Sequence, residues 1–347
     1  MLLHNVILFI TLIGFAIYLF SFSYKFRKEN RYGFNSTLVT ASILFSLAFL
    51  IIFIDWLLPY PLNAVINIWI AIIFSIQCIY YLIIKIKYKE SGNKENIEGQ
   101  TYENGKIKVK GELLRKSFHS VIILVLFCYY FFAPWINEII FQVYLEGPEL
   151  YYSIWQTSEY PLPPNSTPNL KIIFSWTLML FISALLLLLI PDVFRIYNRK
   201  YSIFSGVYKK VIRLKEFYTV GPQIYLTLAC TFVFLLSMLG IFIPRISLAA
   251  MMIAAFGDAA AAIFGRKYGK HKFNTILQKD EKKSYEGLIA GLFISYISAL
   301  FIVGPIIAIL GALSFTILDF LNPKIADNVL NPILCSIAMM IPYWILI

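Results

Sequence analysis

Residues 254–265 read AAFGDAAAAIFG, and residues 266–287 continue as RKYGKHKFNTILQKDEKKSYEG. The first part has the apolar and small residues of a membrane-spanning helix, except that it contains the carboxylate of Asp258. The second part is a polar loop in which seven residues are Lys or Arg. An acid at the membrane edge followed by glycines and a basic loop suits a metal-bound polyphosphate. A small-residue packing face followed by an ordinary basic loop explains the stretch equally well.

The composition of the whole chain is that of a membrane protein. Of its 347 residues, 59% are hydrophobic and 14% are charged, and the mean hydropathy is +0.74. These values predict an all-α, polytopic integral membrane protein. Ten apolar runs are long enough to span a bilayer, at residues 3–24, 36–58, 62–84, 117–136, 170–190, 222–243, 246–264, 285–303, 305–321 and 329–347.

The basic residues predict the orientation of these helices. With the N-terminus outside, 28 of the 30 Lys and Arg residues fall in cytoplasmic loops, so both termini are expected outside. The net charge of +11 is then a topology signal, and a nucleic-acid partner is not expected. The expected partner is the lipid bilayer of the endoplasmic reticulum in a eukaryote, or of the cell membrane in a prokaryote. The pattern predicts no oligomeric state.

Three regions are expected along the chain. Residues 1–84 form three N-terminal transmembrane helices, and residues 85–110 are a polar cytoplasmic linker with too little apolar content to form a core. Residues 111–347 form a seven-helix unit whose segment 137–169 is external. The sequence has no internal repeat and no matched pair of broken helices of the kind found in many transporters.

The helix after the linker opens with GELLRKSFHS at residues 111–120. Glu112, Arg115, Lys116 and His119 are spaced to share one helical face. A basic collar that snorkels to the membrane surface explains Arg115 and Lys116 equally well. It does not explain His119, which lies a turn deeper, although a lone buried His is more often a hydrogen-bonded core residue.

Two further polar groups are predicted on the cytoplasmic side. The segment PDVFR places Asp192 and Arg195 at an i, i+3 spacing, for which a structural ion pair or a helix cap is the alternative to a catalytic role. The segment LDFLNPKIADNVLNP at 318–332 brings Asp319, Asp327 and Asn328 to the same side. Its Asn and Pro residues are typical of a turn, whereas its acids need another explanation.

All these polar groups lie on one side of the membrane in the topology predicted from the basic residues. Asp258 is about 9 Å from the end of its apolar run, and an acid at that depth is a functional candidate by default. Acids that hold a divalent ion and lysines that hold phosphates favour phosphoryl or nucleotidyl transfer. A Walker A motif is absent, because only three residues separate Gly265 from Gly269 and His271 follows Lys270.

The ordered motifs resemble those of the CTP-dependent lipid-alcohol kinases, which include dolichol (polyprenol) kinase, fungal-type diacylglycerol kinase and phytol kinase. They are RKSFH at 115–119, the loop with Asp192, Arg195 and Glu216, GDAAAAIFGRKYGK at 257–270, KSYEG at 283–287 and ADNVLNP at 326–332. The resemblance covers Gly111 to the C-terminus. The chain has Ala326 where many family members have a second acid, and Asp319 is the suggested substitute.

The resemblance implies CTP as phosphate donor and Mg²⁺ as cofactor. It assigns nucleotide and metal binding to eight positions, Gly257, Asp258, Gly265, Lys283, Glu286, Gly287, Asp327 and Asn328. The full set expected is catalytic Asp258, Asp192, His119 and Lys283; nucleotide-binding Gly257, Gly265, Arg266, Lys270, Lys283, Glu286, Gly287, Asn328, Arg115, Lys116 and Arg195; and metal-binding Asp258, Asp327 and Asp319.

The expected function is transfer of the γ-phosphate of CTP to a membrane lipid alcohol, with a polyprenol slightly favoured. Asp192 and His119 are rival candidates for the base that accepts the alcohol proton. The alternatives are a diacylglycerol or archaeol-like kinase, a phosphatidate-type cytidylyltransferase, and an ion-coupled transporter in which Asp258 binds a cation. The His-Gly-Gly and Asp-Arg elements of the cytidylyltransferases are absent, which favours a kinase.

Overall fold

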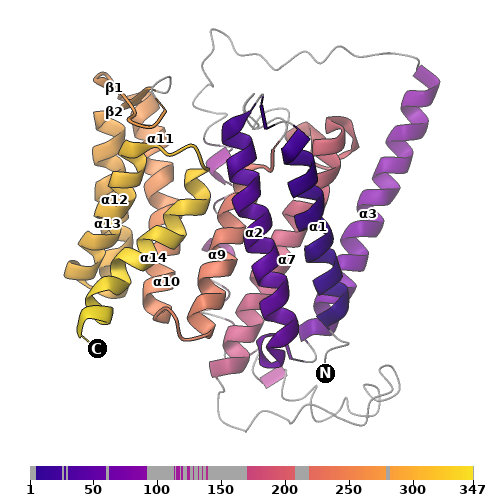
Figure 1. The fold of residues 1–347 in the computed structure, drawn as a ribbon, viewed down its shortest axis with the longest axis horizontal. Coiled ribbons are helices and arrows are strands. Elements are labelled where there is room, and N and C mark those ends of the chain that lie inside the picture. The colour runs from indigo at the N-terminus through magenta and orange to yellow at the C-terminus, as the bar shows by residue number, and fades with distance from the viewer. Residues whose placement is uncertain are drawn as a thin grey trace.

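The computed structural model describes residues 5–25, 27–28, 30–59, 62–91, 113, 115–117, 119, 123–125, 128, 132, 135, 138–139, 170–207, 219–278 and 282–346. These residues form a helical bundle with one short β-hairpin at one end (Figure 1). The longer helices are α1 (Val6–Lys25), α2 (Arg31–Phe53), α3 (Leu62–Ser91), α7 (Leu170–Tyr197), α9 (Pro222–Met238), α10 (Pro244–Met252), α11 (Asp258–Lys267), α12 (Tyr285–Val303), α13 (Pro305–Leu321) and α14 (Asp327–Leu346).

Five shorter elements complete the described structure. Two 3₁₀ turns, η2 (Asp55–Leu57) and η4 (Arg199–Tyr201), follow α2 and α7, and a π-helical segment, η6 (Ile253–Gly257), joins α10 to α11. The strands β1 (Lys272–Asn274) and β2 (Lys282–Ser284) pair antiparallel, with Phe273 opposite Lys283. The β-hairpin leads directly into α12, whose first turn is capped by the Ser284 hydroxyl.

The chain is an integral membrane protein by the length and composition of its helices. Seven helical stretches in the described residues are long and apolar enough to cross a bilayer, and α9 and α13 are shorter apolar helices. These nine correspond to nine of the ten predicted spans. Most of the tenth, 117–136, lies outside the described residues, so the number ten stays a prediction.

Two helices extend beyond the expected spans. α3 continues to Ser91, into the range predicted as linker, while residues 92–110 lie outside the described part of the chain. α7 continues through Pro191 and Asp192 to Tyr197, so the segment PDVFR is helical and not the start of a loop. The apolar pattern predicts only the part of a helix that crosses the membrane. The helix itself continues beyond the last apolar residue, because its backbone hydrogen bonds do not depend on apolar side chains.

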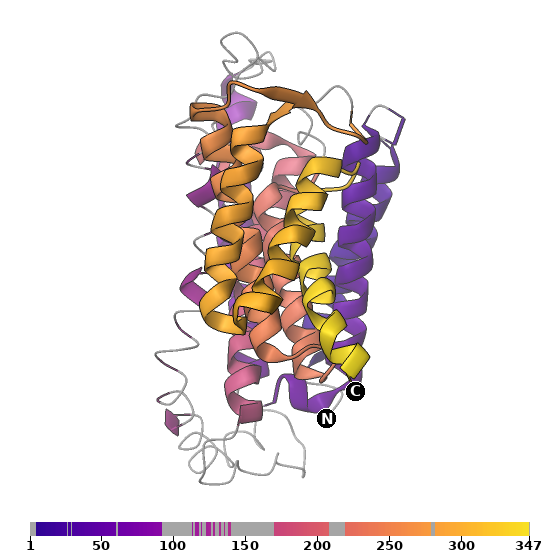
Figure 2. The same cartoon turned by 90° about the vertical axis from the view of Figure 1, so that its left-hand side faces the viewer.

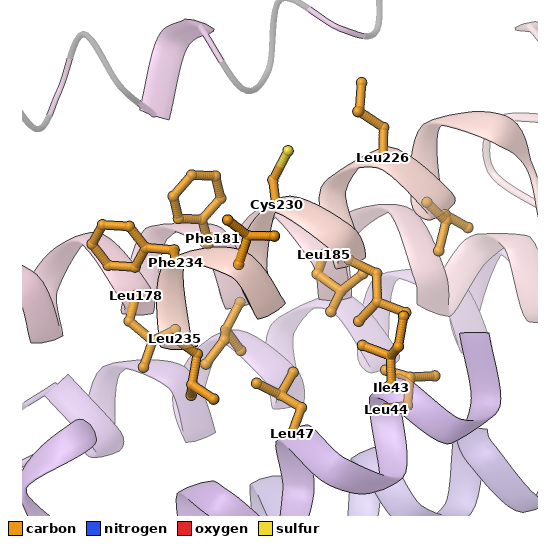
Figure 3. Close-up of a cluster of buried hydrophobic side chains, with 14 of the residues drawn as sticks. Ile43, Leu44, Leu47, Leu178, Phe181, Leu185, Leu226, Cys230, Phe234 and Leu235 are labelled. Atoms are coloured by element: carbon orange, nitrogen blue, oxygen red, sulfur yellow. The ribbon is translucent and has the colours of Figure 1, made fainter. Parts of the chain in front are cut away.

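The helix α9 lies at the centre of the bundle. Fifteen of its 17 residues are buried, because α2, α7, α10 and α14 all pack against it. In Figure 3 the rings of Phe181 of α7 and Phe234 of α9 lie side by side, and Leu44 and Leu47 of α2 belong to the same buried cluster. The N-terminal helices and the later helices therefore share one hydrophobic core.

The ends of the helices that carry the polar motifs lie together. α9, α12 and α14 begin at the end of the bundle where α11 and α13 finish and where the β-hairpin lies (Figures 1 and 2). The N- and C-terminal ends lie at the opposite end. We call the hairpin end the motif end.

Candidate active site

Asp258 follows a break in regular helix geometry. The π-helical segment η6 ends at Gly257, so Asp258 is the first residue of α11 within one apolar stretch, Pro244–Lys267. A π-helical turn widens the helix by one residue and is found most often at functional sites. Its position here changes the direction of the Asp258 side chain relative to a continuous α-helix.

Asp258 forms a buried ion pair with Lys116. The Lys116 ammonium donates to Asp258 Oδ2, and the two side chains are only 4% and 11% exposed. His119 is also buried, and its Nδ1 lies 3.4 Å from the carbonyl oxygen of Ala255 in η6. Of the predicted polar face at 115–119, Lys116 therefore contacts the predicted acid, and His119 contacts the segment that precedes it.

A second ion pair lies in the same region. Lys283 Nζ donates to Asp319 Oδ1 at 2.7 Å and to the Asp319 carbonyl oxygen at 3.0 Å. Burial alone would lower the pKa of Lys283, but the negative charges of Asp319, Asp327 and Asp258 together raise it above its usual 10.5. Lys283 is therefore a permanent cation at neutral pH, and the three acids act on it from α11, α13 and α14.

We call Lys116, His119, Asp258, Lys283, Asp319 and Asp327 the charged cluster. Its members come from five separate segments of the chain, and all were expected as site residues. Asp319, the suggested substitute for the second acid, lies beside Lys283.

Glu286 organises the turn before the hairpin. Its Oε1 accepts hydrogen bonds from the backbone N–H of Lys270 at 3.1 Å and of His271 at 3.0 Å, and contacts His271 Nδ1 at 2.8 Å. Glu286 was expected to bind nucleotide. In the structure it fixes the backbone of Lys270, whose exposed side chain was expected to bind phosphate.

The expected nucleotide-binding glycines lie where α11 and α12 pack closely. A Cβ atom on Gly287 would lie 2.7 Å from the Ala261 carbonyl oxygen and 2.9 Å from Gly265 Cα. A Cβ atom on Gly257 would overlap the Ser295 hydroxyl. The packing explanation of the small-residue stretch therefore applies to all three glycines, and this close contact holds Asp258 against α12.

Asp192 and Arg195 form the ion pair that their spacing predicts. Arg195 Nε donates to Asp192 Oδ1 at 2.5 Å, and Asp192 Oδ2 accepts from Arg195 at 3.1 Å and from the Gly221 N–H at 2.9 Å. Arg195 also donates to the Thr219 carbonyl oxygen. Both oxygens of Asp192 are thus engaged, and the pair connects α7 to the start of α9.

The loop before Asp327 is held from two sides. Gln278 Nε2 donates to the carbonyl oxygens of Asn322 and Pro323 at 3.2 Å and 2.6 Å. From α2, the Ser36 hydroxyl accepts from the Ala326 N–H at 2.9 Å, and Asn35 Nδ2 donates to the Lys324 carbonyl oxygen at 3.2 Å. Nothing in the sequence pattern indicated that α2 contributes to this part of the molecule.

Asn328 connects α14 to α9. Its Nδ2 donates to the Pro222 carbonyl oxygen at 3.0 Å, while its backbone N–H donates to Asp327 Oδ1 at 2.9 Å. Asn328 was expected to bind nucleotide, and here it positions the first turn of α14. Of the remaining expected nucleotide ligands, Arg115 and Arg266 are both half-buried.

Two acids of the expected motifs, Glu112 and Glu216, lie outside the described residues.

No known protein family, curated protein or solved structure matches this chain.

The acids fit a nucleotide-bound Mg²⁺ better than a resident metal ion. Within the described residues, no group of three or more His, Cys, Asp or Glu side chains is arranged to hold a metal. Asp258 and Asp319 are each neutralised by a lysine. Mg²⁺ in nucleotide-dependent enzymes commonly takes one or two carboxylates and completes its shell with phosphates and water. Asp258, Asp319 and Asp327 have that donor chemistry.

Proposed function

We propose that the protein is a CTP-dependent kinase that phosphorylates a membrane lipid alcohol, with a polyprenol as the favoured acceptor. The observation that carries this proposal is the charged cluster, in which three acids and two lysines from five segments meet at the motif end of a membrane bundle. Phosphoryl transfer depends mainly on positioning and on charge neutralisation, and the cluster supplies groups for both.

Lys283 is the proposed phosphate ligand of the cluster. Its raised pKa keeps it charged, and it is the middle residue of β2, where the pairing with β1 fixes its backbone. Arg266 and Lys270 are on the segment just before the hairpin and are proposed to bind the outer phosphates. The nucleotide would compete with Asp319 for Lys283, which leaves the Asp319 carboxylate available as a ligand.

Asp258, Asp327 and Asp319 are the residues proposed to hold Mg²⁺. When bound, the ion would neutralise charge on the phosphates of the nucleotide and help to align them. When no ion is bound, Lys116 neutralises Asp258, so the acid is not left as an uncompensated buried charge.

The alcohol oxygen would attack the γ-phosphorus of CTP. One bond forms between these two atoms as the bond from phosphorus to the oxygen shared with the β-phosphate breaks, which releases CDP. We assign the departing hydroxyl proton to His119, because both oxygens of Asp192 are occupied by Arg195 and Gly221. His119 is buried beside the Lys116–Asp258 pair.

The reaction type is tested by the position of the transferred label. Purified protein in lipid vesicles is given γ-labelled or α-labelled CTP with polyprenol, diacylglycerol or phosphatidate, and the lipids are extracted. We expect label from the γ position only, on an alcohol and not on phosphatidate. Label from the α position would indicate a cytidylyltransferase, preference for diacylglycerol would correct the acceptor, and cation flux without nucleotide would indicate a transporter.

A further inference from the structure

Three buried amide side chains lie where α9 and α14 begin, next to the charged cluster. Gln223 is 3% exposed, Asn328 is 4% and Asn331 is 3%. Asn328 Nδ2 donates to the carbonyl oxygen of Pro222, directly before Gln223, and Asn331 lies one helical turn after Asn328 on the same face. We call Gln223, Asn328 and Asn331 the amide group.

The amide group contains four buried polar atoms that have no hydrogen-bond partner in the described part of the chain. They are both Gln223 side-chain atoms (Oε1 and Nε2), Asn328 Oδ1 and Asn331 Oδ1. An unsatisfied buried polar atom costs about 1–3 kcal/mol, so buried amides without partners are rare in proteins. Four such atoms at the junction of two helices need hydrogen-bond partners that the described residues do not supply.

The atoms of the amide group define the chemistry of that partner. Asn328 is oriented by its bond to Pro222, which leaves an acceptor oxygen free, and Asn331 also presents an acceptor. Gln223 offers a donor nitrogen, Nε2, and an acceptor oxygen, Oε1. A phosphate has only acceptor oxygens and finds few donors here, whereas a hydroxyl donates to an amide oxygen and accepts from Gln223 Nε2.

The location agrees with a hydroxyl that arrives from the membrane. Asn328 follows Asp327 directly, so one edge of the amide group adjoins the charged cluster where phosphoryl transfer is proposed. Gln223 lies in the first turn of α9, the buried central helix, and the buried Asn331 lies one turn further into α14. We infer that the amide group binds the hydroxyl end of the lipid alcohol and presents it to the phosphate site. This inference rests on the proposed function.

Gln223→Met and Asn331→Ala test this inference. Each variant removes the hydrogen bonds to the hydroxyl and also removes an unsatisfied buried amide. We expect the KM for polyprenol to rise about threefold to tenfold, the KM for CTP to stay unchanged, and the melting temperature to stay equal or rise. Thr227→Val is the matched control, because the Thr227 hydroxyl already donates to the backbone carbonyl oxygen of Gln223 at 2.9 Å.

A binding measurement separates failure of this inference from failure of the proposed function. Tritiated polyprenol and tritiated diacylglycerol are titrated without nucleotide into wild-type protein and Gln223→Met in lipid nanodiscs. Weaker binding of either alcohol to the variant supports the inference even if no phosphate is transferred. Equal binding overturns it even if the wild-type protein is a kinase. A rise in the KM for CTP alone would assign the amide group to the nucleotide and also overturn the inference.

Discussion

At the scale of single residues, the ion pair between Lys116 and Asp258 changes what a substitution at Asp258 should do. An unpaired intramembrane acid can be neutralised without loss of stability, and the sequence alone permitted that expectation. In the structure, the partner of Asp258 is a lysine that is 4% exposed. Removing one member of a buried pair leaves the other charge uncompensated.

We therefore expect Asp258→Asn to lower the free energy of unfolding by about 3 kcal/mol, so that the variant melts at a lower temperature than the wild-type protein. Adding Lys116→Met should restore most of the lost stability, because the remaining buried charge is removed. Thermal unfolding of the purified single and double variants in detergent measures both effects. Equal melting temperatures for the wild-type protein and the single variant would refute the buried pair.

Lys283 gives a prediction of pH dependence. Its pKa is raised in the folded protein, so its contribution to stability is complete below 10.5 and is lost as the pH rises through the higher folded value. We expect the melting-temperature difference between wild-type protein and Lys283→Met to be constant from pH 7 to about pH 10 and to shrink above that range. A difference that already shrinks near pH 8 would show that Lys283 is not stabilised by the acids.

At the scale of elements, the N-terminal helix α2 supports the loop that presents Asp327. The sequence separates α2 from the polar motifs by an expected linker, yet Ser36 accepts the Ala326 N–H and Asn35 donates to the Lys324 carbonyl oxygen. Helix α9 also packs against α2 in the core (Figure 3). Helix α2 therefore helps to hold the loop that leads to Asp327 of the charged cluster.

Ser36→Ala should weaken both stability and nucleotide use. The substitution leaves the buried Ala326 N–H without its partner, at a cost of about 1–3 kcal/mol, and frees the loop next to Asp327. We expect a lower melting temperature and a higher KM for CTP. Ser42→Ala in the same helix is the control, since the exposed Ser42 hydroxyl bonds only to the Leu38 carbonyl oxygen in the described residues. Similar effects from both variants would argue against the support role.

Sequence patterns predicted the helices and the residues of the charged cluster, but they did not predict which of these residues contact one another. Apolar runs and basic loops are local signals, and the i, i+3 spacing of Asp192 and Arg195 correctly indicated their ion pair. The partners of Asp258 and Lys283 depend on how distant helices pack, which no local pattern contains. No local pattern indicated the π-helical segment before Asp258 either, because its residues, IAAFG, occur in ordinary membrane helices as well.

At the scale of the whole molecule, the polar motifs and the chain termini lie at opposite ends of the helical bundle. The charged cluster, the hairpin and the starts of α9, α12 and α14 lie at one end, and the two terminal ends of the chain lie at the other (Figure 2). The basic residues predict that the motif end is cytoplasmic. A nucleotide donor is available only on that side, so the proposed function requires this orientation.

Cysteine labelling tests the orientation. Exposed positions at the two ends, Lys272 in the hairpin and Ile241 between α9 and α10, are replaced by cysteine after Cys78, Cys128, Cys230 and Cys335 have been replaced. In intact cells, a membrane-impermeant thiol reagent should label Ile241→Cys at once and Lys272→Cys only after permeabilisation. The reverse pattern would place the charged cluster outside, without access to CTP.

The most direct test of the charged cluster as the phosphoryl-transfer site uses the double variant Lys116→Met/Asp258→Asn. Its melting temperature and its transfer of label from γ-labelled CTP to polyprenol are measured in the same preparation, beside Asp192→Asn/Arg195→Met, which neutralises the buried ion pair of α7 outside the charged cluster. We predict that the first variant folds but loses transfer at least about a hundredfold, while the second retains transfer. A folded Lys116→Met/Asp258→Asn protein that transfers phosphate at the wild-type rate would contradict the account.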